Sequence, residues 1–439
     1  MTEWMRYQDL YERFIECYVG FDTAPNRLTS QENRRTENEA AWESKREALV
    51  ERITHALEND GPWPVGRVGI PDLMWLAALD EVLSRTGLED MVQREQPKLH
   101  VVHGREWRAF LREVPLSPAR PHAVQGGHLR NWLRHHMIVP LVYPPYPVLD
   151  PKVDPESGLM TDPDQERLRI EIAPSTHLAR ALKKQAGGEL KVWLGTFPDG
   201  VMPDWPNISQ GRCTSARLDD PDTRRCSILQ SLEQAQEAGA HVVILPELAV
   251  CPTLRDEILA WLDMHEPGFL LVVPGSYHEA DPNHPERLPC NRAWLCDGSG
   301  GVIVAHEKFI PFKKDHPCHE LITPGNRVTL WRTALGVISL AICRDFCEEE
   351  GWVRQLWDML APEWLLVPSM SNDGGIGAHV LQAKHLYNTC GTRTLLPNQT
   401  PGKNFTSDTS HGFIYPSASG ATTQEWISPD DRLKKLILP

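Results

Sequence analysis

The sequence predicts an α/β fold preceded by a mostly helical N-terminal domain. From Lys191 to about residue 420, short apolar runs alternate with segments of helical periodicity, as in strands and helices that pack in layers. Upstream of residue 140, apolar side chains recur mainly at helical spacing. Six prolines within residues 140–155 separate the two patterns, and so many prolines cannot lie inside regular elements.

These changes in composition predict three parts of the chain. Residues 1–139 would form a mostly helical domain whose role the sequence does not define, residues 140–188 a proline-rich connector and a helix, and residues 189–439 the α/β domain. Within the first part, the apolar stripes predict helices over residues 3–18, 31–59 and 72–83, with shorter helical pieces at 105–113 and 128–138.

Charge and composition argue against several classes of protein. With 45 basic and 59 acidic residues, the net charge of −14 favours solubility and argues against a nucleic-acid or anionic-membrane partner. No stretch approaches the roughly 18 continuous apolar residues that span a bilayer, and the first residues lack the layout of a signal peptide. Ten cysteines without regular spacing indicate reduced thiols. We therefore expect a cytoplasmic protein without membrane association.

The predicted elements of the α/β part alternate along the chain. Apolar runs bounded by charges, glycine or proline predict buried strands, and helical periodicity predicts helices between them. The turn sequence Asp297-Gly298-Ser299-Gly300 joins two such runs and predicts a hairpin. In chain order, the elements are a strand at 191–197, a helix at 224–238, strands at 241–245, 269–274, 291–296, 301–305 and 336–342, a strand ending near Val367, a helix at 378–391 and a hairpin beginning at Gly412.

Three residues capable of acyl-transfer chemistry follow the ends of predicted strands. Cys343 follows the run that begins at Gly336, Glu247 follows Leu245-Pro246, and Lys308 lies where the second hairpin strand opens into a loop. Open α/β sheets place their ligands at the carboxyl ends of strands. Considered singly, Cys343 is more often inert core, Glu247 a surface acid and Lys308 a solvated amine. Their combination favours one shared site.

Together these residues resemble the nitrilase, or carbon–nitrogen hydrolase, superfamily. The motifs that carry the resemblance are Leu245-Pro246-Glu247, Glu307-Lys308 and Ala341-Ile342-Cys343-Arg344-Asp345, in that order, with supporting matches at Asn291, Leu366-Val367-Pro368-Ser369, Asn398 and Gly412-Phe413-Ile414. The resemblance covers about residues 189–425 and leaves the N-terminal extension unrecognised. It implies a four-layer αββα sandwich of the nitrilase type, a homo-oligomer, and a site that needs neither a metal nor an organic cofactor.

The resemblance also implies a role for each residue. A thiol attacks a carbonyl as thiolate, so Glu247 would accept the proton of Cys343 and later return it to the leaving amine. The ammonium of Lys308 and the backbone amide of Arg344 would stabilise the oxyanion of the tetrahedral intermediate. Many relatives carry a second glutamate between the lysine and the cysteine, and Glu320 fits that position.

Two departures from simple patterns bear on the site. Relatives that act on nitriles show Cys-Trp-Glu at the nucleophile, whereas Cys343-Arg344-Asp345 resembles the amidase and carbamoylase branches. His316, Cys318 and His319 raise the alternative of a metal site, but no second pair at ligand spacing accompanies them. We therefore expect these three residues to be structural or to line a pocket.

The sequence therefore favours a hydrolase that cleaves a non-peptide C–N bond of a small amide or carbamoyl compound through a thioester. A glutaminase or acyltransferase of the same fold is one alternative. Another is a non-catalytic scaffold in an oligomeric signalling or defence complex, because residues 1–188 are unexplained and could bind a protein partner. A scaffold has no need for the intact triad, which argues against it. Specificity is expected in loops at 198–223, 312–327 and 370–377.

Overall fold

A computed structural model of the chain defines two compact units, one with two described helices and one with an α/β domain. The helices expected at residues 3–18, 105–113 and 128–138 lie outside the described residues, as do His316 and Cys318. The structure describes residues 38–58, 71–85, 169–173, 178, 182 and 188–437, the last range with breaks at 207, 216, 281–286, 313–318, 326, 334, 348–355, 358–359, 361 and 400–410.

Helices α3 (Glu39–Glu58) and α4 (Asp72–Arg85) pack against each other in the first unit. Helix α3 buries the apolar stripe expected from the sequence, including Trp42 and Ile53. Between the two helices, the buried guanidinium of Arg46 pairs with Glu81. These helices occupy two of the predicted segments, and the helical domain as a whole stays a prediction.

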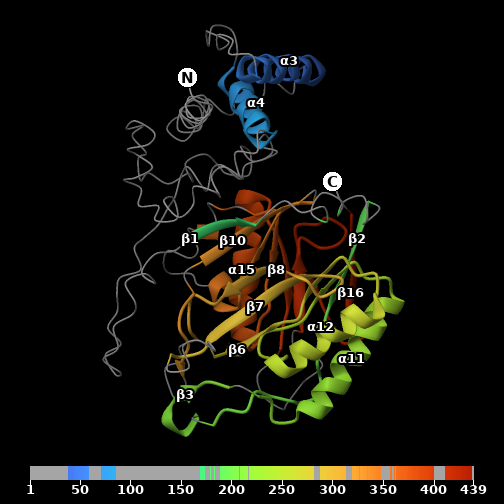
Figure 1. Cartoon of the computed structure of the whole chain (residues 1–439), viewed down its shortest axis with the longest axis vertical. Helices are drawn as coiled ribbons and strands as arrows, with labels where there is room; N and C mark the ends of the chain where they lie inside the picture. The colour runs from blue at the N-terminus through green and yellow to red at the C-terminus, as the bar shows by residue number, and fades with distance from the viewer. Residues whose placement is uncertain are drawn as a thin grey trace. The chain divides into compact units, whose positions relative to one another are not determined.

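Two β-sheets form the centre of the α/β unit (Figure 1). In spatial order, sheet A contains β1 (Arg169–Ala173), β10 (Arg327–Thr333), β11 (Gly336–Leu340), β12 (Trp364–Leu366), β13 (Arg393–Pro397), β14 (Gly412–Tyr415) and β15 (Glu425–Trp426). Sheet B contains β16 (Leu433–Ile437), β2 (Glu189–Leu194), β4 (Val242–Ile244), β5 (Leu271–Val273), β7 (Cys290–Asp297) and β6 (Ser276–Glu279), and β8 (Val302–Glu307) also pairs with β7. Because β11, β12 and β13 are parallel neighbours, their carboxyl ends meet at one edge of sheet A.

Two strands join the sheets from unexpected parts of the chain. Strand β1 pairs in parallel with β10, so a segment expected in the connector contributes an edge strand to sheet A. At the other end of the chain, β16 pairs with β2 beyond residue 425. Both pairings join segments far apart in sequence, which the alternation of apolar runs does not reveal.

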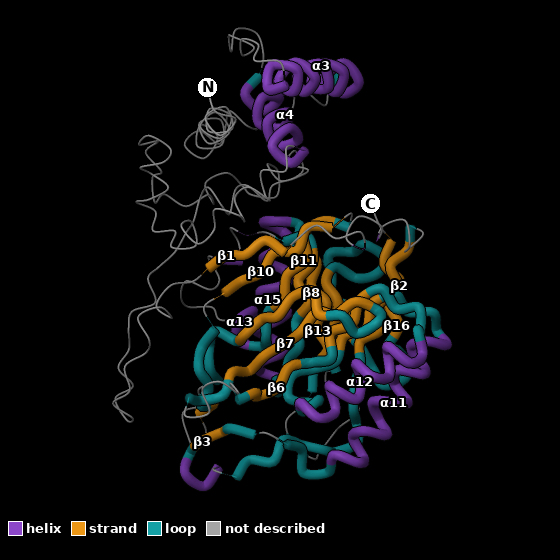
Figure 2. Tube along the Cα trace, in the orientation of Figure 1, coloured by secondary structure: helices purple, strands orange, loops and turns teal. Residues whose placement is uncertain are grey.

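The two sheets pack face to face, and helices lie outside them (Figure 2). One core cluster combines sheet B residues such as Ile244 with sheet A residues such as Leu340. A second cluster lies between sheet B and the helices α11 (Pro221–Glu237) and α12 (Pro252–His265). Helix α15 (Asp373–Cys390) packs against sheet A through the edge-on rings of Tyr387 and Tyr415. The predicted hairpin is present, since β7 and β8 are antiparallel.

A buried arginine fixes α11 to the loop after β4. The helix begins at Pro221, and the carboxylate of the preceding residue, Asp220, caps it by accepting from the backbone N–H of Thr223. Arg224, which is fully buried, donates two hydrogen bonds to Asp199 at 2.7 and 2.8 Å and a third to the carbonyl of Ala249 at 2.9 Å. Because Ala249 lies two residues after Glu247, this contact helps to position the end of β4.

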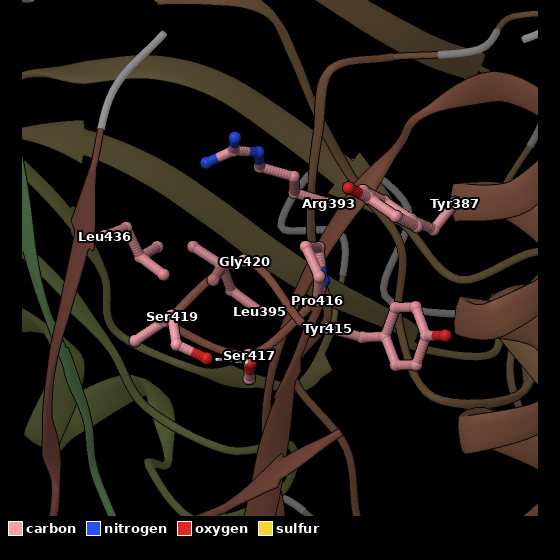
Figure 3. Close-up of a pocket in the computed structure, with 10 residues that line it drawn as sticks. Tyr387, Arg393, Leu395, Tyr415, Pro416, Ser417, Ser419, Gly420 and Leu436 are labelled. Carbon is pink, nitrogen blue, oxygen red and sulfur yellow. Dashed lines mark hydrogen bonds between the residues drawn. The ribbon is translucent and has the colours of Figure 1, made fainter. Parts of the chain in front are cut away.

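A cavity of about 320 Å³ lies at the end of β13 that faces away from Cys343. Figure 3 shows the rings of Tyr387 and Tyr415 on one side of it and the hydrogen-bonded pair Ser417 and Ser419 on the other. Arg393, also part of its lining, begins β13, whereas the residues after β13 reach the site described below. Within the described ranges, no helix is long and apolar enough to cross a membrane.

The buried pair predicts a difference between two neighbouring arginines. Replacing Arg224 by methionine should lower the free energy of unfolding by about 3–5 kcal/mol, because it leaves the carboxylate of Asp199 buried without its cation. Arg225 forms a solvent-exposed pair with Glu257, so Arg225→Met should change stability little. Urea denaturation followed by circular dichroism measures both. Equal shifts for the two variants would contradict the assignment.

Candidate active site

The structure brings Glu247, Lys308 and Cys343 to the positions that the sequence predicted, each just after a strand. Glu247 follows β4, Lys308 follows β8 and Cys343 follows β11. All three side chains are buried, with 1%, 2% and 8% of their surfaces exposed. Because these side chains are buried, charges interact strongly and each polar atom needs a partner.

The ammonium of Lys308 is shared by two buried carboxylates. Its Nζ donates to Glu247 Oε1 at 2.8 Å and to Glu320 Oε2 at 2.7 Å. Asn291 also links the two acids, because its Nδ2 donates to Glu247 at 2.9 Å and to Glu320 at 3.0 Å. The backbone N–H of Lys308 donates to the carbonyl of Asn291 at 2.8 Å, which fixes the start of the lysine side chain. The arrangement is a compact network around one cation.

Glu320 enters this network from a small separate sheet. It lies in β9 (His319–Glu320), which pairs in parallel with β3 (Arg212–Cys213). Its carboxylate accepts from the backbone N–H of Phe312 at 2.8 Å and contacts His278 Nε2 at 3.0 Å. Since the other ring nitrogen of His278 accepts from the backbone N–H of Ser215 at 3.0 Å, Nε2 carries the proton and donates to Glu320.

The pKa values of Glu247 and Glu320 are shifted in opposite directions, although both acids contact the same ammonium. Burial raises the pKa of Glu247 well above its usual range, and the charge that Cys343 would carry as a thiolate raises it further, against the attraction of Lys308. Burial also acts on Glu320, but Lys308 and His278 overcome it and lower the pKa of Glu320. Although burial alone would lower the pKa of Lys308, the two carboxylates raise it. Glu247 is therefore the acid suited to exchange a proton.

The turn after β11 holds Cys343 in a strained backbone conformation. Its φ is 45°, in the left-handed region that non-glycine residues rarely adopt. The N–H of Cys343 donates to the carbonyl of Pro368 at 2.9 Å, and the short helix α13 (Arg344–Cys347) begins at the next residue. The residue after Glu247, Leu248, also has a positive φ, 55°. Strain of this kind persists where surrounding contacts enforce it, and it concentrates at functional sites.

Asp345 joins the cysteine turn to the lysine turn. Its Oδ1 accepts from the backbone N–H groups of Phe309 and Ile310, both at 2.9 Å, just after Lys308. Its Oδ2 lies 3.1 Å from His306 Nε2. The fully buried carboxylate thus fixes the backbone after Lys308 relative to the backbone after Cys343. Asp345 of the Cys-Arg-Asp motif therefore has a structural role, which the motif alone did not reveal.

The polar contacts of the Cys343 thiol come from the segment after β12. Sγ lies 3.3 Å from Ser371 Oγ, 3.6 Å from Ser369 Oγ and 3.8 Å from the carbonyl oxygen of Met370. Between the two serines, the backbone N–H of Met370 donates to Glu247 Oε2 at 3.0 Å. In the described part of the chain, no hydrogen bond joins the thiol directly to Glu247. The oxygen atoms that contact the sulfur thus belong to Ser371, Ser369 and Met370, whereas the sequence predicted Glu247 as the proton acceptor.

One glycine allows the strand ends of sheet B to approach this closely. Gly275 has φ 74°, and a Cβ at this position would lie 2.4 Å from the carbonyl oxygen of Pro246. Any side chain would therefore push the loop after β5 away from the segment that carries Glu247.

Sequence reasoning missed several residues of this site. The motifs include Asn291 and Ser369 only as supporting matches and Asp345 only beside the cysteine, and they do not include His278 or Ser371. The recurring signal is position, since Ser369 follows a strand end just as Cys343 does. His319 is exposed, and His316 and Cys318 lie outside the described residues.

The cysteines require one correction. Cys213 is disulfide-bonded, whereas the sequence indicated reduced thiols throughout. Pairing through space cannot be read from spacing along the chain. The free thiols among the described cysteines include Cys226, Cys251, Cys296, Cys343 and Cys347. The expectation of a cytoplasmic protein loses the support that it took from reduced cysteines.

Comparisons with known proteins give a likeness in structure. No family model matches the chain, and no curated protein matches it. An amidase from Nesterenkonia sp. AN1, in a mutant with the acetamide moiety of fluoroacetamide on its active-site cysteine, is 15% identical with a TM-score of 0.42, over 57% of this chain and 90% of that one. Another mutant of this amidase, described as from the nitrilase superfamily, is 17% identical with a TM-score of 0.41, over 57% and 91%. The chain resembles nitrilase-superfamily amidases.

The raised pKa of Glu247 predicts how thiol reactivity changes with pH. As the pH falls through that pKa, Glu247 becomes protonated and can no longer accept the proton of Cys343, so alkylation of Cys343 should slow at a pH above the ordinary carboxyl value of 4.5. Iodoacetamide labelling followed by peptide mass mapping measures this rate.

The exposed thiol Cys226 serves as the internal control in the same digests. At neutral pH, Cys343 should label faster than Cys226 although it is buried. If the acid limb for Cys343 fell at or below 4.5, or if its profile matched that of Cys226, the role of Glu247 would be contradicted.

Proposed function

We propose that the α/β unit is a cysteine-dependent carbon–nitrogen hydrolase of the nitrilase superfamily that acts on a small amide or carbamoyl compound. The observation that carries the proposal is the buried Lys308 ammonium, held between Glu247 and Glu320 beside a cysteine on a strained turn. A purely structural core seldom contains two buried carboxylates for one buried ammonium, because removing charged groups from water costs free energy. The four-layer αββα arrangement of that superfamily is part of the proposal.

The acylation step uses the thiol, Glu247 and Lys308. The sulfur of Cys343 attacks the substrate carbonyl as its proton passes to a carboxylate oxygen of Glu247, and the carbonyl π electrons move to the oxygen. The ammonium of Lys308 and the backbone N–H of Arg344 stabilise the resulting oxyanion. When the C–N bond breaks, Glu247 returns the proton to the departing amine, which leaves a thioester on Cys343.

Deacylation repeats the same proton movements with water. Glu247 accepts a proton from the attacking water, the tetrahedral intermediate again places its oxyanion near Lys308, and Cys343 leaves as a thiolate that is reprotonated. Glu320 stays ionised throughout, because its pKa is lowered. It keeps Lys308 protonated and in place while Glu247 changes charge. Each carboxylate therefore has a separate task.

Loss of the nucleophile predicts loss of turnover. Ammonia release from a panel of amides, ureas, carbamoyl amino acids and nitriles would identify the reaction class, and Cys343→Ala should abolish it while leaving the circular dichroism spectrum unchanged. Cys343→Ser should be nearly inactive, since a hydroxyl is much harder to deprotonate than a thiol. Cys296→Ala, which removes another buried free thiol, is the matched control. Turnover at the wild-type rate in Cys343→Ala would favour a scaffold instead.

Lys308 should affect the transition state more than substrate binding. If its ammonium binds the developing oxyanion, Lys308→Ala should lower kcat by roughly 10²-fold or more with a smaller change in KM. Lys308→Arg should not restore activity, because a planar guanidinium cannot replace a compact ammonium among packed neighbours.

Lys434 provides the matched control for this substitution. It is also a buried lysine between two carboxylates, Glu425 and Asp431, but it lies in β16. Lys434→Ala should cost stability and leave kcat at the wild-type value. A Lys308→Ala enzyme with unchanged kcat and a higher KM would make Lys308 a substrate-binding residue, and the oxyanion role would be abandoned.

A further inference from the structure

A buried histidine is connected to the Cys343 thiol through two serine hydroxyls. Ser371 Oγ lies 3.3 Å from Cys343 Sγ and 3.1 Å from Ser369 Oγ. Ser369 Oγ in turn lies 3.1 Å from His379 Nε2, and the other ring nitrogen of His379, Nδ1, lies 2.9 Å from the carbonyl oxygen of Gly375. All four of these side chains are buried.

Donor and acceptor chemistry determines the direction of this chain of hydrogen bonds. A carbonyl oxygen only accepts, so Nδ1 of His379 carries a proton, and in the neutral ring Nε2 is an acceptor. Ser369 therefore donates to His379. Its oxygen can then accept from Ser371, whose own oxygen accepts from the thiol of Cys343. With these assignments, every proton in the chain can point from the sulfur toward the imidazole.

We propose that Ser371 and Ser369 form a proton relay between Cys343 and His379. His379 takes up the thiol proton through the two serines and does not contact the sulfur itself, so it is a positioning residue. The inference rests on the proposed function in that it concerns the same nucleophile. The relay gives the Cys343 thiol a second proton acceptor besides Glu247. Glu247 approaches the thiol from sheet B, whereas the relay residues lie after strands of sheet A and in α15. The residues of the relay come from the segment after β12 and the first turns of α15.

The transfer conserves atoms and charge. The S–H bond of Cys343 breaks, and its proton passes to Ser371 while the proton of Ser371 passes to Ser369 and that of Ser369 passes to His379 Nε2. Each hydroxyl loses one proton and gains one, so the products are one thiolate and one imidazolium. Ser371 can then donate to the thiolate, and Ser369 lies 3.6 Å from the same sulfur. Hydrogen bonds to an anion are stronger than neutral ones and would stabilise this state.

The surroundings hold the relay in place. The backbone N–H of Ser371 donates to Asn398 Oδ1 at 2.8 Å, and Asn398 Nδ2 donates back to the carbonyl of Ser371 at 3.0 Å. The ring of Phe346 lies edge-on to the ring of His379 at 5.9 Å. Because Asn398 directly follows β13 and Phe346 lies in α13, two neighbouring segments fix the two ends of the relay.

Other ionisable groups lie near the thiol, and their effects on its titration have to be distinguished from the effect of the relay. On the side of sheet B, Glu247, Lys308 and Glu320 form the network described above. On the cysteine turn itself, Asp345 pairs with His306. A change in the titration of Cys343 is therefore assigned to the relay only where variants of His379 and Ser369 produce it with these five groups intact.

The test measures thiolate formation directly and needs no substrate. The ultraviolet absorbance of the thiolate is titrated against pH, and the difference from Cys343→Ala isolates the thiol in question. In His379→Gln, the side-chain carbonyl can still accept from Ser369 but cannot take up a proton near neutral pH. Thiolate formation should therefore move to higher pH by about one unit, which makes iodoacetamide labelling at neutral pH about tenfold slower.

Two further variants separate the relay from a packing effect. Ser369→Ala, which interrupts the relay in the middle, should give the same shift, and the double variant should add little to either single one. The control is His265→Gln, because Nδ1 of His265 also lies 2.9 Å from the carbonyl oxygen four residues earlier in its helix, on the exposed side of α12. This variant should titrate as the wild type does.

The outcomes also separate this inference from the proposed function. An unchanged thiolate titration in His379→Gln and Ser369→Ala would overturn the relay, and so would labelling that is slower by the same factor at every pH, including alkaline pH where the thiol is fully ionised. Neither result depends on ammonia release. Conversely, a shifted titration in a protein that turns over no C–N substrate would support the relay and count against the hydrolase.

Discussion

The shared ammonium of Lys308 is the interaction on which the rest of the site depends. One cation lies between Glu247 and Glu320, and Asn291 bridges the same two acids, so removing any member leaves a buried group without its partner. Glu247 follows β4 in the interior of sheet B, Lys308 follows β8 and Glu320 lies in the small β3–β9 sheet. Close packing of these elements is therefore needed to form the site, and formation of the site in turn restricts how they pack.

The cysteine belongs to the other sheet and is coupled to this network through backbone. Asp345 accepts the two N–H groups that follow Lys308, and Met370, which precedes Ser371, donates its N–H to Glu247. Both contacts cross from sheet A to sheet B at the strand ends. Since a buried N–H without an acceptor costs about 1–3 kcal/mol, these contacts hold the turn that carries the thiol at a fixed distance from Lys308 and Glu247.

The sequence predicted the site residues that follow the ends of apolar runs, but it did not predict contacts between segments that are far apart along the chain. Glu247, Lys308 and Cys343 each end an apolar run, so their strand ends could be predicted, and Glu320 could be placed by analogy. The pairing of β1 with β10, the disulfide of Cys213 and the contacts of Asp345 join segments far apart in sequence. His379 lies in a helix that was correctly predicted, yet its contact with Ser369 depends on how that helix packs on sheet A.

The distribution of charge in the core distinguishes an enzyme from a scaffold more sharply than the motifs do. A structural core can replace buried ion pairs by apolar side chains at no loss, whereas this one retains two carboxylates for one ammonium and a residue with positive φ at the adjacent cysteine. The excess negative charge is tolerated because the pKa of Glu247 is raised, so that this acid can hold a proton. A buried carboxyl with a raised pKa near a thiol serves no purpose in packing, but it suits the proton transfer that the proposed C–N cleavage requires.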